Sequence, residues 1–200
     1  MRGTSGAAFA ARLLRRWPRP ATAGHALLGA VLFGLGHRGP RATSAVIGQL
    51  LAGRTVAEVE VIARELAARW LAQRSLPRSR DALLAHLARG DLVILASAAP
   101  APLVAAFARA LGVARWIGTR YAGAAGVYDG SLAGRATVGA GKLRCVAELL
   151  RQRSLDFGAV SAYCNDYDDR ELLARAAHPV VVRPERRLAA LVRASGWPQL

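Results

Sequence analysis

The feature that most constrains the fold is a regular alternation of apolar, strand-like runs and helical patterns from residue 91 to residue 195. The first run, Asp91 to Ser97 (DLVILAS), is continuously apolar and ends in small polar residues, as buried parallel strands do. The pattern at 101–112 (APLVAAFARALG) predicts a helix that ends at Gly112. Strands and helices that alternate in this way form mostly parallel sheets, so we expect an α/β fold for this part.

The same alternation continues to the end of the chain. Short strands joined by glycine-containing turns are expected at 114–122 and 126–139, with one turn at Asp129-Gly130. The later elements expected are a helix at 142–153, a strand at 157–164, an acidic loop at 165–169, a helix at 170–177, a strand at 179–184 and a terminal helix.

Residues 5–90 are expected to be nearly all helical. The clearest pattern starts at Thr55, which stands at capping-box spacing from Glu58. Other helices are expected at 5–20, stopped by Pro18 and Pro20, at 43–51 and at 79–90, with Ser79 as N-cap. The apolar run at 25–36 is too short to span a bilayer, for which roughly 20 residues are needed, and is interpreted as a buried helix.

The chain is strongly basic, with 28 Lys and Arg against 13 Asp and Glu, a net charge of +15 and a pI near 11.6. This charge favours anionic partners such as phosphates, nucleic acid or an anionic membrane surface. All the basic residues except Lys142 are arginine, a bias that a GC-rich genome explains for most of them. Cys145 and Cys164 show no disulfide or metal spacing, so a reduced, cytoplasmic chain is expected.

Polar side chains follow three elements of the predicted sheet. Ser97 ends the first strand, Lys142 begins a helix, and an acidic loop with Asn165, Asp166 and Asp169 follows a later strand. In open α/β sheets ligands bind beyond the carboxyl ends of the strands. A hydroxyl, an ammonium and carboxylates gathered there suit a phosphate with Mg²⁺, although each has an ordinary explanation alone, as a strand end, a surface lysine or a helix start.

The order of these motifs resembles the haloacid dehalogenase-like hydrolases, and most of all their phosphoserine-phosphatase-like branch. The resemblance is carried, in this order, by LVILASAAP, GTRY, GVYDGSLAG, GAGKLRCVAEL and AYCNDYDDRELLARAAHPVVVRP. It implies a Rossmann-like parallel core at 91–200 and an N-terminal helical region at 1–90 that includes a cap. It also implies that Ser97 and Lys142 bind phosphate and act in catalysis, and that Asp169 with Asn165 or Asp166 binds Mg²⁺.

The first motif of that family, an aspartate nucleophile followed by x-Asp-Gly-Thr at the end of the first strand, is not found. No aspartate precedes Asp81, and only Gly3 and Thr4 match the Gly-Thr, with Arg2 where the acid/base aspartate belongs. The expectation is therefore that the first core strand is missing and that the chain starts where that strand should end.

The resemblance implies phosphomonoester hydrolysis through an aspartyl-phosphate, with a phosphorylated small molecule or a lipid phosphate as substrate. Without the nucleophile we expect the chain as given to be weak or inactive. Alternatives are a non-catalytic relative that binds a phosphorylated ligand, and a basic protein that binds nucleic acid or the surface of a membrane. No recognised nucleic-acid motif is present, so a specific nucleic-acid partner is not expected.

Overall fold

The computed structural model describes residues 4–17 and 40–200, with side chains in the second range from Ser44 onward. Contacts divide the chain into two compact units, which are described one at a time. The first unit contains Met1–Ser75 and Val93–Ala136, and the second contains Leu76–Leu92 and Thr137–Leu200. The helix predicted at 25–36 lies outside the described residues.

Among its described residues, the first unit has three helices before its first strand: α1 (Ser5–Arg16), α3 (Pro40–Leu51) and α4 (Val56–Arg74). Thr4 caps α1 by accepting a hydrogen bond from the backbone N–H of Ala7. The predicted capping box of α4 is confirmed, because Thr55 accepts from the N–H of Glu58 while Glu58 accepts from the N–H of Thr55. These helices therefore start where local side-chain chemistry predicts.

A strand–helix–strand unit follows. Strand β1 (Ile94–Pro100) and strand β2 (Arg115–Thr119) pair in parallel, and α6 (Ala101–Ala110) connects them. Gly112 follows α6 with a φ of +70°, the left-handed conformation that ends many helices. The parallel arrangement predicted for this part of the chain is thus confirmed.

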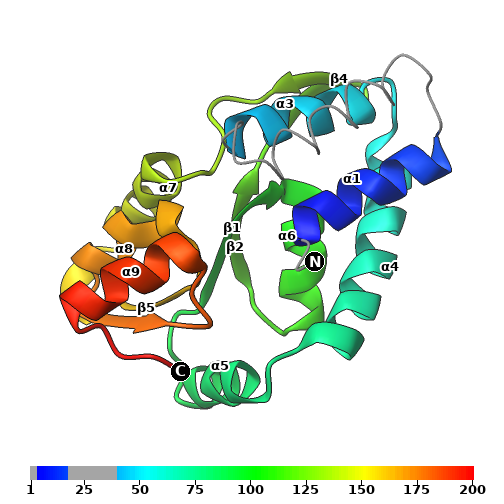
Figure 1. Ribbon diagram of the computed structural model, residues 1–200. Helices are drawn as coiled ribbons and strands as arrows, with labels where there is room; N and C mark the ends of the chain where they lie inside the picture. The colour runs from blue at the N-terminus through cyan, green and yellow to red at the C-terminus, as the bar shows by residue number, and fades with distance from the viewer. Residues whose placement is uncertain (1–3, 18–39) are drawn as a thin grey trace. The chain divides into compact units, whose positions relative to one another are not determined.

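A β-hairpin made of β3 (Tyr121–Ala124) and β4 (Val127–Leu132) completes the first unit, next to α3 (Figure 1). Its turn is Ala125-Gly126, with φ of +49° and +76°, the pattern of a type I′ turn. The turn predicted at Asp129-Gly130 is wrong, because both residues lie inside β4. Gly130 instead lies against Gly48 of α3, where a Cβ on Gly48 would collide with the Gly130 carbonyl oxygen.

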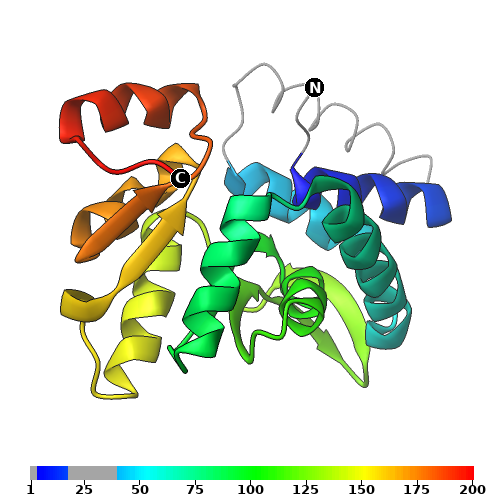
Figure 2. The same cartoon turned by 90° about the horizontal axis from the view of Figure 1, so that it is seen from below.

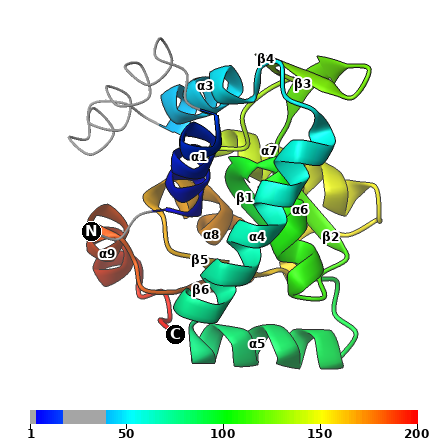
Figure 3. The same cartoon turned by 90° about the vertical axis from the view of Figure 1, so that its right-hand side faces the viewer.

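The core of the first unit forms where the helices meet. Helices α4 and α6 lie side by side, and α1 packs on α4 (Figure 3). The largest fully buried side chains of this core come from four helices and are Phe9, Leu13, Leu51, Val59 and Leu103.

The second unit contains a second parallel pair of strands. Its elements are α5 (Pro77–Ala88), α7 (Ala140–Arg151), β5 (Ser161–Cys164), α8 (Arg170–Arg175), β6 (His178–Val181) and α9 (Arg186–Ser195), with 3-10 turns at Phe157–Ala159 and Tyr167–Asp169. Strands β5 and β6 pair in parallel, with α7 on one side and α9 on the other (Figure 2). Val181 also forms a parallel bridge with Gln199, so the C-terminal residues cover the outer side of β6.

The start of α5 differs from its prediction. The helix begins at Pro77, and its N-cap is Leu76, which makes no side-chain capping bond. The predicted N-cap, Ser79, lies inside the first turn. Proline is favoured at the first helical position because its fixed φ suits a helix and its missing N–H would have no partner there.

The described residues thus form an α/β protein with two parallel strand pairs and one antiparallel hairpin. None of the described helices is long and apolar enough to cross a membrane.

Candidate functional site

Ser97 lies on β1, in the first unit, where the ladder to β2 becomes irregular. Its Oγ accepts a hydrogen bond of 3.2 Å from the N–H of Ala99. The neighbouring carbonyl of Ala98 accepts a hydrogen bond of 2.9 Å from the hydroxyl of Thr119 at the end of β2. The predicted phosphate-binding hydroxyl therefore belongs to a locally well-defined segment of backbone.

Lys142 lies in the first turn of α7, in the second unit, and only 8% of it is exposed. Its Nζ lies 2.6 Å from Oδ1 and 2.7 Å from Oδ2 of Asp169, so the ammonium contacts both carboxylate oxygens. The helix is preceded by Gly139, whose φ is +50°, a conformation that glycine adopts without strain. The structure thus brings together two residues that the sequence placed in separate motifs.

Burial governs the electrostatics of this pair. It raises the pKa of the Asp169 carboxyl above its usual value, the Lys142 ammonium opposes that rise, and the negative charges of Asp166 and Asp168 add to it. The adjacent Cys164 is also buried, and burial raises the pKa of its thiol to about 12. A buried carboxylate of this kind keeps its charge only beside a cation.

Asn165 and Asp166 lie in the loop between β5 and α8, and both are exposed. Asp166 accepts a hydrogen bond of 3.0 Å from the N–H of Asp168, which caps the 3-10 turn that carries Asp169. The carbonyl of Asn165 accepts a hydrogen bond of 2.9 Å from the N–H of Glu185, so the loop is tied to the segment that follows β6.

The donors of this loop fit Mg²⁺ chemically, because carboxylate and amide oxygens are the ligands that this hard cation takes. The fit is partial. Across residues 4–17 and 40–200, no group of three or more His, Cys, Asp or Glu side chains is placed to hold a metal ion. Since Asp169 is also engaged by Lys142, the loop offers Asn165 and Asp166 as the donors with exposed side chains. Magnesium commonly binds through one or two carboxylates and keeps several waters.

Two residues near these positions were not singled out by the sequence. Thr119 is fully buried and bonds to the backbone beside Ser97. Glu185 accepts a hydrogen bond from the N–H of Tyr167 in the acidic loop. The signal for Thr119 was a polar residue at the end of the strand-like run RWIGT. Nothing in the sequence marked Glu185.

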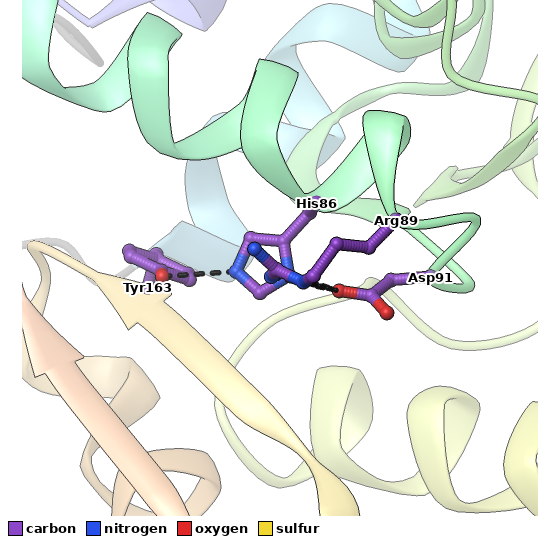
Figure 4. Close-up of polar contacts among 4 residues, drawn as sticks. All are labelled: His86, Arg89, Asp91 and Tyr163. Carbon is purple, nitrogen blue, oxygen red and sulfur yellow. Dashed lines mark hydrogen bonds and ion pairs between the residues drawn. The ribbon is translucent and has the colours of Figure 1, made fainter.

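A second polar cluster lies in the second unit, where it links α5 to β5 (Figure 4). His86 lies with Nδ1 2.7 Å from Oδ2 of Asp91 and with Nε2 3.0 Å from the hydroxyl of Tyr163. Arg89 donates to the same Asp91 oxygen. Hydrogen bonds from His86 and Arg89 hold the pKa of Asp91 below its usual value. No sequence motif pointed to this cluster.

These observations define a class: an α/β protein with parallel strand pairs and a buried lysine–carboxylate pair beside an acidic loop that follows a strand. Residues 1–174 match the haloacid dehalogenase-like hydrolase family. The chain therefore belongs to this family, and its relatives place it in the phosphoserine-phosphatase-like branch.

Phosphoserine phosphatase SerB1 of Mycobacterium tuberculosis is 32% identical to the chain over 145 residues, which are 72% of this chain and 47% of that protein. The chain thus spans about half the length of the curated relatives it matches.

Two solved structures are similar in fold. A protein of unknown function from Bordetella pertussis Tohama I superposes with a TM-score of 0.83 at 25% identity, covering 98% of this chain and 91% of that one. A substrate-bound phosphoserine phosphatase superposes with a TM-score of 0.63 at 13% identity, covering 91% of this chain and 82% of that one. At that identity the second likeness shows the fold alone.

Proposed function

We propose that the chain carries the phosphate- and metal-binding residues of a Mg²⁺-dependent phosphomonoester hydrolase of the aspartyl-phosphate type. The observation that carries this proposal is the buried pair of Lys142 and Asp169. A buried ion pair of this kind brings a desolvation cost, so structural stability alone explains it poorly. A fixed ammonium beside an oxygen-rich loop is well suited to a phosphoryl group, whose charge must be offset.

Each proposed residue has a separate task. The hydroxyl of Ser97 donates a hydrogen bond to a phosphate oxygen, and the ammonium of Lys142, oriented by Asp169, offsets the phosphoryl charge. Asn165 and Asp166, with Asp169, are the residues that would hold Mg²⁺. The ion, when bound, would supply further positive charge against the phosphoryl oxygens.

The nucleophile of this chemistry is not found among the 200 residues at the position where the first motif of the family has it. No aspartate precedes Asp81, so neither the aspartate that would form the aspartyl-phosphate nor the acid/base aspartate is present there. A second candidate function is a protein that binds a phosphorylated ligand through the same residues without hydrolysing it. In both cases we expect the 200-residue chain alone to show weak or no turnover.

The proposed substrate is a phosphorylated small molecule or a lipid phosphate. A phosphorylated small molecule is supported by the name of the relative from Mycobacterium tuberculosis, a phosphoserine phosphatase. The proposed location is the cytoplasm, which the free thiols at Cys145 and Cys164 support. A peripheral membrane contact remains a proposal based on the basic charge.

We also propose that residues 1–90 include the cap and that residues 91–200 form the core.

A binding experiment tests the shared part of both candidates. The full chain, labelled with ¹⁵N, is titrated with inorganic phosphate in the presence of Mg²⁺. We expect shifts in the amide signals of residues 97–99 and 140–143. Ser97→Ala and Lys142→Ala should each weaken binding, whereas Arg144→Ala, an exposed change two positions from Lys142 on α7, should not. Unchanged affinity in a folded Ser97→Ala variant would refute the assignment of Ser97.

A further inference from the structure

The pairing of β1 with β2 contains a bulge at Ser97. Ala96 pairs with Ile117 and Pro100 pairs with Thr119, so residues 97–99 of β1 face Gly118 alone. Bulges of this kind redirect side chains and are common next to active sites. The bulge, rather than a regular strand end, therefore sets the position of the Ser97 hydroxyl.

Gly118 makes room for this arrangement. A Cβ at Gly118 would lie 2.9 Å from the Cα of Ala101 and 2.9 Å from Cγ2 of Val104, both on α6. Contacts this short do not occur in folded proteins, so a side chain at this position would push α6 away from β2. Because α6 begins directly after β1, such a shift would also move the bulge.

Two hydroxyl groups hold the bulge in place. Ser97 Oγ accepts from the N–H of Ala99 across the bulge, and Thr119 Oγ1 donates to the carbonyl of Ala98 at its centre. Thr119 is 0% exposed, so water does not compete for this bond. A carbonyl that a bulge removes from the ladder needs another donor, and Thr119 supplies one.

The contacts of Ser97 leave its hydrogen available. Its oxygen is used as an acceptor, and within residues 4–17 and 40–200 no group accepts a hydrogen bond from it. A hydroxyl has one donor besides its acceptor sites, so Ser97 can keep its bond from Ala99 and still donate to a phosphate oxygen.

We propose that Thr119 is a positioning residue for phosphate binding: its hydroxyl fixes the bulge at 97–99 and thereby aims the hydroxyl of Ser97 at the phosphate. This inference rests on the phosphate-binding role proposed for Ser97. Thr119 does not touch the phosphate itself, and its effect passes through the carbonyl of Ala98.

The test compares four variants of the full chain by their affinity for inorganic phosphate with Mg²⁺ present. Thr119→Val keeps the shape of the side chain and removes the hydroxyl, and we expect it to weaken binding about fivefold or more. Thr119→Ser keeps the hydroxyl and should restore most of the affinity. Ser97→Ala should lose binding further. Tyr121→Phe is the matched control, because it removes another buried hydrogen bond to a carbonyl, that of Ser44, in the same unit.

The outcomes separate this inference from the proposed function. If Ser97→Ala loses binding but Thr119→Val does not, the role of Thr119 is refuted while the proposed function stands. If Thr119→Ser is as weak as Thr119→Val, or if Tyr121→Phe is equally weak, the loss is one of packing or stability and the inference is again refuted. If the unchanged chain does not bind phosphate, or Ser97→Ala binds normally, the proposed role of Ser97 fails and the role of Thr119 fails with it.

Discussion

Lys142 and Asp169 form a buried ion pair in which one ammonium contacts both carboxylate oxygens, at 2.6 and 2.7 Å. The two residues are 27 positions apart, and their contact ties the start of α7 to the loop that follows β5. About a tenth of each side chain is exposed, 10% for Lys142 and 9% for Asp169. At this burial the loss of either partner leaves an uncompensated charge, which is costly.

The first prediction is that Lys142→Ala destabilises the chain by about 3–5 kcal/mol near neutral pH. Burial already raises the pKa of Asp169 in the folded chain, and removal of the lysine takes away the group that opposes this rise. The ionised carboxylate therefore costs stability in full above its raised folded-state pKa, and this cost shrinks as the pH falls from that value toward the lower pKa of the unfolded chain. Urea unfolding at several pH values should show a loss that shrinks in acid.

The matched variant is the double change Lys142→Ala with Asp169→Asn, which removes both charges. If the pair acts as described, the double variant should be more stable near neutral pH than Lys142→Ala alone. Equal stability of the two variants at every pH would contradict the description of Asp169 as a buried charge held by Lys142.

The second prediction concerns turnover. The 200-residue chain should show weak or no hydrolysis of p-nitrophenyl phosphate with Mg²⁺, because no aspartate stands where the family nucleophile and its acid/base partner belong. A colorimetric assay with and without EDTA measures this, with Lys142→Ala as the background. Robust turnover that Lys142→Ala abolishes would show the prediction wrong and would require another nucleophile.

The third prediction concerns Tyr121 in the first unit. Its hydroxyl donates a hydrogen bond of 3.0 Å to the carbonyl of Ser44, and burial raises the pKa of the phenol above its usual range. Tyr121→Phe should cost about 1–2 kcal/mol, because the hydrogen bond is lost inside the protein. Urea unfolding measures the change. Tyr167→Phe is the comparison, since the hydroxyl of this half-buried tyrosine forms no hydrogen bond with any of the described residues, and an equal loss there would contradict the prediction.

The sequence predicted the elements well where local chemistry decides them. The capping box at Thr55, the parallel strand at residue 94 and the helix at Lys142 follow from side-chain spacing and apolar pattern. Two details failed because packing or a competing local signal overrode them. Asp129-Gly130 was expected to turn, but Gly130 is used for its close approach to Gly48, and Ala125-Gly126 turns instead. Pro77, not Ser79, starts its helix.

The candidate site was predictable only in part. The single lysine of the chain pointed to a position where a compact ammonium is needed, and the buried contact with both oxygens of Asp169 gives a physical reason why a broad guanidinium would not fit. The role of Thr119 could not be read from sequence, because it depends on a bulge that exists only once β1 and β2 pair. The cluster at His86 could not be read from sequence either, because His86 and Tyr163, which are in contact, lie 77 positions apart.

The fourth prediction separates the two thiols. Cys145 is exposed, whereas Cys164 is buried and its pKa is raised to about 12. Iodoacetamide at neutral pH should therefore label Cys145 and leave Cys164 almost unmodified, because the thiolate is the reactive form. Labelling of Cys164 should rise with pH or in urea. Peptide mass spectrometry measures both sites in the same sample, and equal labelling of the native chain at neutral pH would contradict the burial of Cys164.

The fifth prediction is that His86 holds α5 against β5. Helix α5 has no buried residue, so apolar packing contributes little to its attachment, and the hydrogen bond between His86 and Tyr163 contributes a larger share (Figure 4). His86→Ala should speed amide hydrogen exchange within 77–88 by about fivefold, the effect of one hydrogen bond. Tyr163→Phe should act alike, and His178→Ala, an exposed histidine on β6, should not. Exchange measured by mass spectrometry at one pH decides the matter, since unchanged protection of α5 in both His86→Ala and Tyr163→Phe would mean that other contacts hold this helix.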